Sequence, residues 1–261
     1  MGGETFKTRG VVTAIRPWSR TSHVVTWLTP DRGPVTTLVK GAVRPKSAFL
    51  GQYDLFYTCD VVCYERASGG LRALREVAAA NARERLRGDW RAASLAGYAT
   101  DLVSAHAPPT GESARWFDFL ERTLDGLSGD LRSMVGFELG FLSLAGLSPD
   151  FSARDPEAEW QPFALDGGRI GEGGRTVRLS RGTIATLAGE DDRWPEAVRF
   201  LGLFLQHHLD VRADVRRSLV KMLGSGLAFP TDGGAGAPAP LHKEIDGVTH
   251  FAPGCAPAQG D

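Results

Sequence analysis

Three cations in a seven-residue segment are the residues of this chain best suited to chemistry, and that chemistry is phosphate binding. Lys40, Arg44 and Lys46 lie in the segment 40–47, directly after the apolar, β-type run 35–39. A glycine and a proline interrupt the segment, so it neither continues the strand nor begins a helix. A rigid loop that presents Lys and Arg at the end of a strand suits contact with phosphate groups. The alternative is ordinary solvated surface, which any β-domain carries.

The charge of the chain is unevenly distributed. The 261 residues have a formal net charge of −1. Residues 1–50 nevertheless hold eight Lys or Arg and two acidic residues, whereas residues 81–160 hold eight Arg and thirteen acidic residues. A chain that is nearly neutral as a whole therefore has a basic N-terminal region and an acidic central region. A local basic field, rather than the net charge, is what phosphate binding requires.

Further cations and one aromatic side chain extend the candidate site. Arg16, Arg20 and Arg32 lie near strand ends or turns of the same region, and Trp18 lies in the polar turn Arg-Pro-Trp-Ser-Arg. Proteins that bind single strands combine cations that follow the backbone with rings that stack on bases. We expect Trp18 to be exposed, whereas Trp27 belongs to the core.

The cysteines predict buried thiols rather than a metal site. Cys59 and Cys63 are four residues apart on an expected strand, so both point to the same face. No second pair lies nearby to complete a zinc site, so we expect no metal. Three cysteines in the whole chain also argue against a disulfide scaffold and suit a reducing cytosol.

Catalytic motifs are missing from the sequence. It contains no nucleophile elbow, no Walker loop and no dinucleotide-binding glycine pattern. Glu190, Asp191 and Asp192 form an acidic group that a metal-dependent hydrolase would use, but they precede Pro195, so we expect them to cap a helix instead. We therefore predict that the protein is not an enzyme and needs no cofactor.

Neither a signal peptide nor a membrane anchor is expected. The first residues lack the apolar core of a signal peptide. No stretch approaches the run of about 20 apolar residues that crosses a bilayer.

The front of the chain has the pattern of a small β-barrel. Alternation and turn residues predict five strands, at 6–15, 22–29, 35–39, 55–65 and 71–78. A five-stranded OB-fold fits this count and binds single strands or oligosaccharides on one face. An SH3-like barrel fits the count nearly as well.

The remainder is mostly helical. Apolar stripes predict helices at 90–105, 116–127, 131–147, 183–188, 195–208 and 215–223. The third is apolar nearly all round, which indicates burial by its neighbours. We expect an α+β protein with a barrel domain at 1–80 and an all-helical C-terminal domain at 81–230. A small irregular insertion near 150–178 carries a hairpin at 163–170, and residues 231–261 form a disordered tail.

Several segments, taken in order, resemble the family of the bacterial recombination mediator RecO. They are Gly10-Val11-Val12, the turn Arg20-Thr21-Ser22-His23, the hairpin at 28–34, the basic loop at 40–47 and the helix end at 137–149. No one motif is decisive, but their order and spacing make the match specific.

The resemblance implies an N-terminal OB-fold, a helical C-terminal domain and no enzymatic turnover. It implies binding to single- and double-stranded DNA, strand annealing, and partnership with RecR and the single-stranded DNA-binding protein in loading RecA. Such a protein is cytoplasmic and associates with the nucleoid. Lys40, Arg44 and Lys46 carry over as DNA contacts, with Arg16, Arg20 and Arg32 as weaker candidates. We expect little sequence preference and an affinity that falls steeply with salt.

One departure from the family pattern limits these expectations. Many members carry a four-cysteine zinc module after the helix end, but residues 151–230 of this chain contain no cysteine. We therefore predict no zinc, with the hairpin as a metal-free remnant. The alternative function is a protein-binding adaptor whose barrel has lost DNA affinity.

A basic helix surface near the end of the helical region is a candidate for partner binding. Arg212, Arg216, Arg217 and Lys221 share it and suit an acidic tail with a hydrophobic end, such as that of the single-stranded DNA-binding protein. The competing interpretation is a solvated face where cations favour a helix C-terminus.

Overall fold

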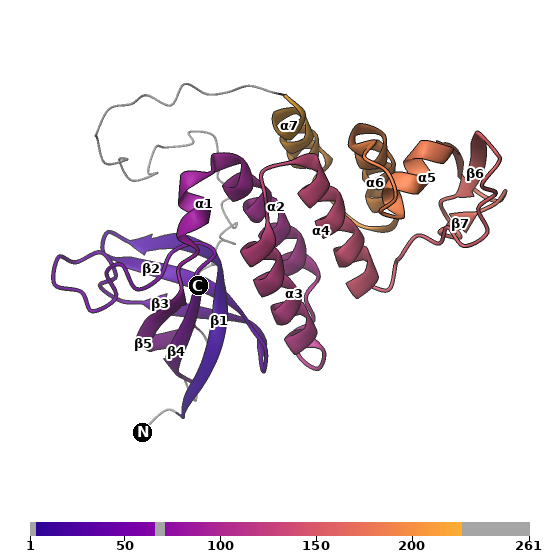
Figure 1. Cartoon of the computed structure of the whole chain (residues 1–261). Coiled ribbons are helices and arrows are strands. Elements are labelled where there is room, and N and C mark those ends of the chain that lie inside the picture. The colour runs from indigo at the N-terminus through magenta and orange to yellow at the C-terminus, as the bar shows by residue number, and fades with distance from the viewer. Residues whose placement is uncertain (1–3, 66–70, 226–261) are drawn as a thin grey trace, which may run out of the picture. The chain divides into compact units, whose positions relative to one another are not determined.

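A closed five-stranded barrel forms the front of this computed structural model, which describes residues 4–65 and 71–225 (Figure 1). Its strands are β1 (Thr5–Ser19), β2 (Ser22–Thr29), β3 (Gly33–Val39), β4 (Thr58–Tyr64) and β5 (Arg72–Asn81). They close in the order β1-β2-β3-β5-β4, with β3 and β5 parallel and the other neighbours antiparallel. This arrangement confirms the predicted OB-type barrel.

The long strand β1 pairs with two neighbouring strands of the barrel. Residues Thr5–Val11 pair with β4, and the part from Val11 to Ser19 pairs with β2. The interior is filled by the alternate, apolar side chains of the strands, among them Val25 and Trp27. Trp27 is fully buried, as predicted, and its indole N–H donates to Thr37 Oγ1 at 2.9 Å.

Helices follow the barrel. They are α1 (Glu84–Gly88), α2 (Trp90–His106), α3 (Ser113–Gly126), α4 (Leu131–Leu144), α5 (Arg181–Leu187), α6 (Trp194–His208) and α7 (Ala213–Gly224). The predicted all-round apolar helix is α4, which contacts α2, α3, α6 and α7. Because neighbours cover it from several sides, it buries Phe141 and Leu142 completely.

A buried ion pair crosses this helical core. Glu138 of α4 is 0% exposed, and Arg216 of α7 donates to both of its carboxylate oxygens at 2.7 Å. Tyr98 also donates to Glu138, at 2.8 Å, and burial raises the pKa of Tyr98. Gly202 makes room for the pair, because a Cβ at this position would collide with the Arg216 guanidinium. The prediction that Arg216 belongs to an exposed partner-binding surface is therefore wrong.

The expected hairpin belongs to a small three-stranded sheet. Its strands are β6 (Trp160–Ala164), β7 (Arg169–Ile170) and β8 (Thr176–Ser180), in the order β7-β6-β8. Strands β6 and β7 are the predicted hairpin, and β8 is an additional strand that pairs with the other edge of β6. Phe163 of β6 packs against Phe200 and Phe204 of α6, which attaches the sheet to the helices.

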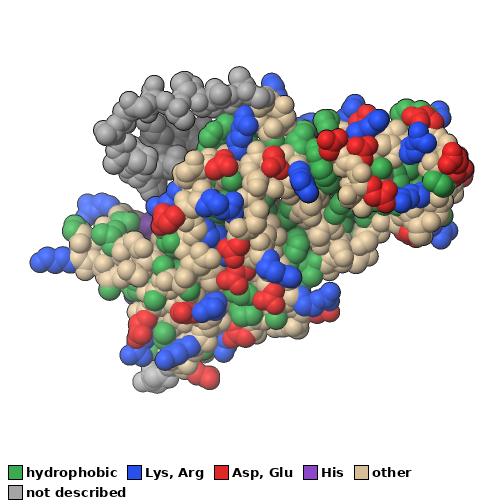
Figure 2. All heavy atoms as spheres, viewed as in Figure 1, with side chains coloured by type: hydrophobic (Ala, Val, Ile, Leu, Met, Phe, Trp, Pro, Cys, Tyr) green, Lys and Arg blue, Asp and Glu red, His purple; other side chains and the backbone are tan. Residues whose placement is uncertain are grey.

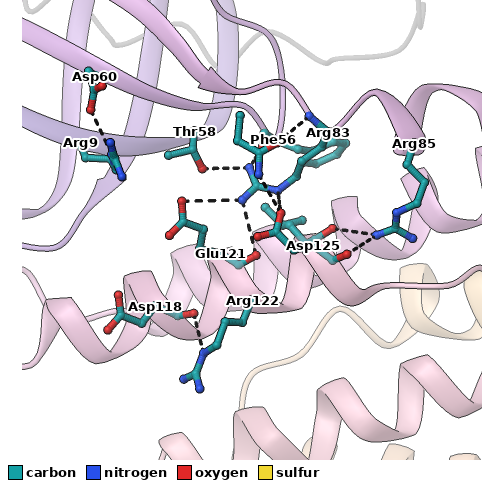
Figure 3. A network of polar contacts seen from close by, with 12 residues as sticks. Arg9, Phe56, Thr58, Asp60, Arg83, Arg85, Asp118, Glu121, Arg122 and Asp125 are labelled. Carbon is teal, nitrogen blue, oxygen red and sulfur yellow. Dashed lines mark hydrogen bonds and ion pairs between the residues drawn. The ribbon is translucent and has the colours of Figure 1, made fainter.

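Arg83 joins the barrel to the helices. Its guanidinium donates to the carbonyl oxygen of Phe56 at 2.6 Å, to Thr58 Oγ1 at 2.9 Å and to Asp125 Oδ1 at 2.7 Å (Figure 3). Thr58 is the first residue of β4 and Phe56 lies just before it, whereas Asp125 is in α3. Contacts unite the barrel and the helices in one unit, Met1–Gly226. The predicted disordered tail, 231–261, lies outside the described residues.

None of the helices in the described ranges is both long enough and apolar enough to cross a membrane.

Candidate nucleic-acid interface

The basic loop between β3 and β4 is a series of tight turns. Four backbone hydrogen bonds, each spanning three residues, follow one another along it: Arg44 N to Gly41 O, Ser47 N to Arg44 O, Leu50 N to Ser47 O and Gln52 N to Phe49 O. Their N···O distances lie between 2.9 and 3.3 Å. Because each turn starts near the end of the one before, the loop has a defined path, as the prediction of a rigid loop requires.

Side chains of the loop anchor it to the barrel. Ala42 is buried, and Phe49 and Tyr53 pack against the barrel core. The Tyr53 hydroxyl lies 2.9 Å from Nδ1 of His23 on β2, and burial raises the pKa of Tyr53 to about 12. Phe49 and Tyr53 are therefore partly buried rings that pack on the barrel.

The loop lies against the turn that connects β1 and β2. The Gly41 N–H donates to Ser22 Oγ at 3.3 Å, and the Val43 N–H donates to the carbonyl oxygen of Thr21 at 3.4 Å. Gly41 has a φ of 68°, a conformation that favours glycine. The stem of Arg44 lies across Gly41, since a Cβ there would be 3.3 Å from Arg44 Cδ.

Two neighbouring segments thus form one surface, which we call the basic end of the barrel. Its members are Arg16, Trp18, Arg20, Lys40, Arg44 and Lys46, and each of these side chains is exposed. Blue and green spheres gather at the left edge of the barrel in Figure 2. The structure therefore brings together all the predicted DNA-binding residues except Arg32.

The cations of the basic end have no acidic partners in the part of the chain that the structure describes. Within the described ranges, none of the ion pairs involves one of its Lys or Arg side chains. Residues 12–28 and 34–53, which form these segments and their strands, contain no Asp or Glu. By contrast, Arg9 pairs with Asp60 at 3.0 Å and Arg87 with Asp54 at 3.1 Å. Cations without internal partners are free to bind an external anion.

A shallow hollow opens within the basic end. It has a volume of about 380 Å³ and is lined by Trp18, Ser19, Ser22, Leu38, Lys40, Gly41 and Arg44. An aromatic ring, hydroxyl groups and two cations therefore face one space.

Arg32 lies elsewhere. It follows β2, at the opposite end of that strand from the β1–β2 turn. Its guanidinium stacks over the Phe6 ring at 4.0 Å and pairs with Glu65 at 3.5 Å. Arg32 is thus engaged within the barrel, where it does not contribute to the basic end.

The thiols and the acidic group have structural surroundings. Cys59 and Cys63 are buried, as predicted, and burial raises their thiol pKa values to about 12 and about 11. Glu190 pairs with Arg154 at 2.7 Å and Asp191 with Arg193 at 3.3 Å. No side chain caps the N-terminus of α6, so the predicted capping role of this acidic group is wrong.

The basic surface of α7 is smaller than predicted. Arg217 and Lys221 are exposed, whereas Arg212 lies 3.6 Å from Asp214 and Arg216 is buried. The remaining cations give no more than a modest positive face.

Sequence reasoning missed the residues that hold the far end of the basic loop. Arg83 binds the Phe56 carbonyl, and Arg87 contacts Asp54 and the Tyr57 hydroxyl. Both arginines lie in the charged stretch around α1, some 30 residues from these partners. Nothing local marks Arg83 as different from its neighbours, because the signal is a long-range hydrogen bond.

The sequence is similar to proteins of one known family. The family model described as Recombination protein O N terminal matches residues 1–83, and Recombination protein O C terminal matches residues 87–154. The DNA repair protein RecO of Anaeromyxobacter sp. (strain K) is 32% identical over 248 residues, which cover 83% of this chain and 96% of that relative. The DNA repair protein RecO of Geobacter metallireducens is 32% identical over 149 residues, covering 55% of this chain and 59% of that relative.

Proposed function

Because the chain belongs to the RecO family of DNA repair proteins, we propose that the basic end of its barrel binds DNA. The observation that carries the proposal is a set of exposed cations on two adjoining segments that contain no acidic residue. Lys40, Arg44 and Lys46 contact phosphates, and Arg16 and Arg20 extend the contact along the β1–β2 turn. Phosphate contacts position the protein but do not distinguish bases, so sequence preference is weak.

The family relationship also supports a proposal about the finer role of the protein. We propose a non-enzymatic mediator of recombination that binds single- and double-stranded DNA and anneals complementary strands. It works with RecR and the single-stranded DNA-binding protein to load RecA, in the cytoplasm and close to the nucleoid. The family relationship supports these assignments, and the helical part supplies surfaces for protein partners.

A fluorescence-anisotropy titration with a labelled oligonucleotide tests DNA binding. We expect the affinity of the wild type to fall linearly with salt on a double-logarithmic plot. The variant Lys40→Ala/Arg44→Ala/Lys46→Ala removes three phosphate contacts, so the slope should become shallower by about 2 for a single strand.

A matched control separates specific contacts from net charge. The variant Arg122→Ala/Arg169→Ala/Arg199→Ala removes three exposed arginines of the helical region and small sheet, and it should bind as the wild type does. If the wild type binds no better than the Lys40/Arg44/Lys46 variant at low salt, the barrel does not bind DNA there. The adaptor alternative would then be favoured.

A further inference from the structure

We propose that the hollow in the basic end is a subsite for one unpaired nucleotide, whose base stacks on Trp18 and whose phosphate lies between Lys40 and Arg44. The inference rests on the proposed function and adds to it the kind of DNA that the site takes. A base that is paired in a duplex cannot turn its face to the indole, so the subsite selects single strands.

The ring of Trp18 makes no ring contact with the other residues that the structure describes. Trp18 is 62% exposed, and within the described ranges it has no ring contact, hydrogen bond or cation over its face. Two other exposed tryptophans differ, because Arg91 lies over Trp90 at 5.5 Å and Arg178 over Trp160 at 5.8 Å. The face of Trp18 is therefore open to a ligand.

Trp18 lies at an irregularity in the pairing of β1 with β2. Pro17 pairs with His23 and Ser19 with Ser22, so the register shifts by one residue and Trp18 is the extra residue of a β-bulge. Bulges redirect a side chain and are frequent beside functional sites.

The lining of the hollow matches the parts of a nucleotide. Its volume of about 380 Å³ lies at the lower end of the range for ligand pockets, roughly 300–1,000 Å³. Lys40 and Arg44 supply positive charge for a phosphate, and Ser19 adds a hydroxyl. Ser22 Oγ accepts the Gly41 N–H, which leaves its own hydrogen to donate. Aromatic stacking together with backbone-tracking cations is how single-strand binders hold a strand.

The experiment compares Trp18→Ala with Trp160→Ala by fluorescence anisotropy. The ligands are a labelled single-stranded oligonucleotide, a duplex of the same length and an oligonucleotide of abasic residues with the same number of phosphates. We expect Trp18→Ala to lose about 5- to 100-fold in affinity for the single strand, because stacking on one base is worth that much. Its salt slope should stay unchanged, because no phosphate contact is lost. Trp160→Ala, also an exposed tryptophan, should bind like the wild type.

The other two ligands isolate stacking. The wild type should bind the abasic oligonucleotide more weakly than the normal one, and Trp18→Ala should lower that affinity no further. Trp18→Phe should restore part of the lost affinity for the normal single strand. The duplex should show little change with either tryptophan variant.

Failure of this inference is distinct from failure of the proposed function. If Trp18→Ala binds the single strand as the wild type does, while Lys40→Ala/Arg44→Ala/Lys46→Ala binds poorly, the subsite is overturned and DNA binding stands. An equal loss on abasic and normal strands also overturns the subsite. If the wild type binds none of the three ligands, both proposals fall.

Discussion

Arg83 donates a 2.6 Å hydrogen bond to the carbonyl oxygen of Phe56, and both residues have a left-handed backbone conformation. Their φ angles are 47° and 70°, and within the described ranges they are the non-glycine residues with positive φ. Such conformations are unfavourable by about 1–3 kcal/mol each and persist only where surrounding contacts enforce them. Phe56 closes the basic loop and Arg83 precedes the helices, so one hydrogen bond couples the end of the loop to the start of the helical region.

The first prediction concerns Arg83→Met. This change leaves the Phe56 carbonyl and Thr58 hydroxyl without their buried donor, so the free energy of unfolding should fall by about 2–4 kcal/mol. Urea denaturation followed by circular dichroism measures the loss. The control Arg9→Met removes an exposed pair with Asp60 and should lose about 0–1 kcal/mol. Equal losses in the two variants would mean that Arg83 is not a structural junction.

Gly41→Ala should destabilise the basic loop and displace the side chain of Arg44. An alanine at φ 68° is unfavourable by about 1–2 kcal/mol, and its Cβ would also press on the stem of Arg44. Gly51→Ala is the matched control, because Gly51 has a φ of 74° in the same loop with nothing within 4 Å of a Cβ. We expect both variants to lose stability in urea and only Gly41→Ala to lose DNA affinity by anisotropy. DNA affinity unchanged in Gly41→Ala would show that the position of Arg44 is unimportant.

The buried pair of Glu138 and Arg216 should show strong coupling. Arg216→Met leaves an uncompensated carboxylate in the core, which lowers stability by about 3–5 kcal/mol. The double variant Glu138→Leu/Arg216→Met removes both charges and should be more stable than either single variant. Chemical denaturation of the four proteins gives the coupling energy. Additive single losses would contradict a direct pair.

Acid should weaken the contact that α6 makes with α5 and the end of β8. Hydrogen bonds from Thr183, at 2.7 Å, and Ser180, at 3.1 Å, lower the pKa of Glu196 below its ordinary value. A lowered folded-state pKa stabilises the protein above the unfolded-state pKa, and this stabilisation is lost as pH falls through the folded-state value. Glu196→Gln should therefore lower the melting temperature at neutral pH, and this effect should be smaller near about pH 3, below the ordinary glutamate pKa of about 4.3.

Glu157→Gln provides the control for this pH dependence. The Glu157 carboxylate has no ion pair or hydrogen bond within the described ranges, so this variant should follow the wild type at both pH values. A Glu196→Gln effect that is the same at both pH values would contradict a role for the charge.

The fold was largely predictable because its signals are local. Alternation and turn residues located the barrel strands, and β2 begins and ends at the predicted residues, 22 and 29. The apolar circumference of α4 predicted its central position. The third strand of the small sheet, β8, was missed although Thr176–Ser180 alternates polar and apolar residues, because the run is only five residues long and its partner is the edge of β6.

Partnerships between distant residues were not predictable. Nothing in the sequence around Arg216 distinguishes it from the exposed basic residues near it. Its burial is explained by its partner Glu138, which lies 78 residues away in the sequence. Arg32 and Arg20 both lie near turns of the basic N-terminal region, so the sequence does not distinguish them. The guanidinium of Arg32, however, stacks on Phe6 of another strand. The residue types of the candidate site were predicted, because the excess of Lys and Arg over acidic residues in 1–50 is visible in the sequence. Trp18 and Lys40 line the same hollow because of a bulge and the strand register, which the sequence does not reveal.

The space that Gly202 leaves for Arg216 has a consequence for the history of the protein. A Cβ at position 202 would lie 2.4 Å from an Arg216 guanidinium nitrogen, so a larger residue there requires the guanidinium to move from its place against Glu138. Selection would therefore act on positions 138, 202 and 216 together. A lineage that replaced the glycine first would pass through a less stable ancestor in which the pairing of Glu138 was disturbed. Pairwise covariation among these positions in related sequences would be the trace of that constraint.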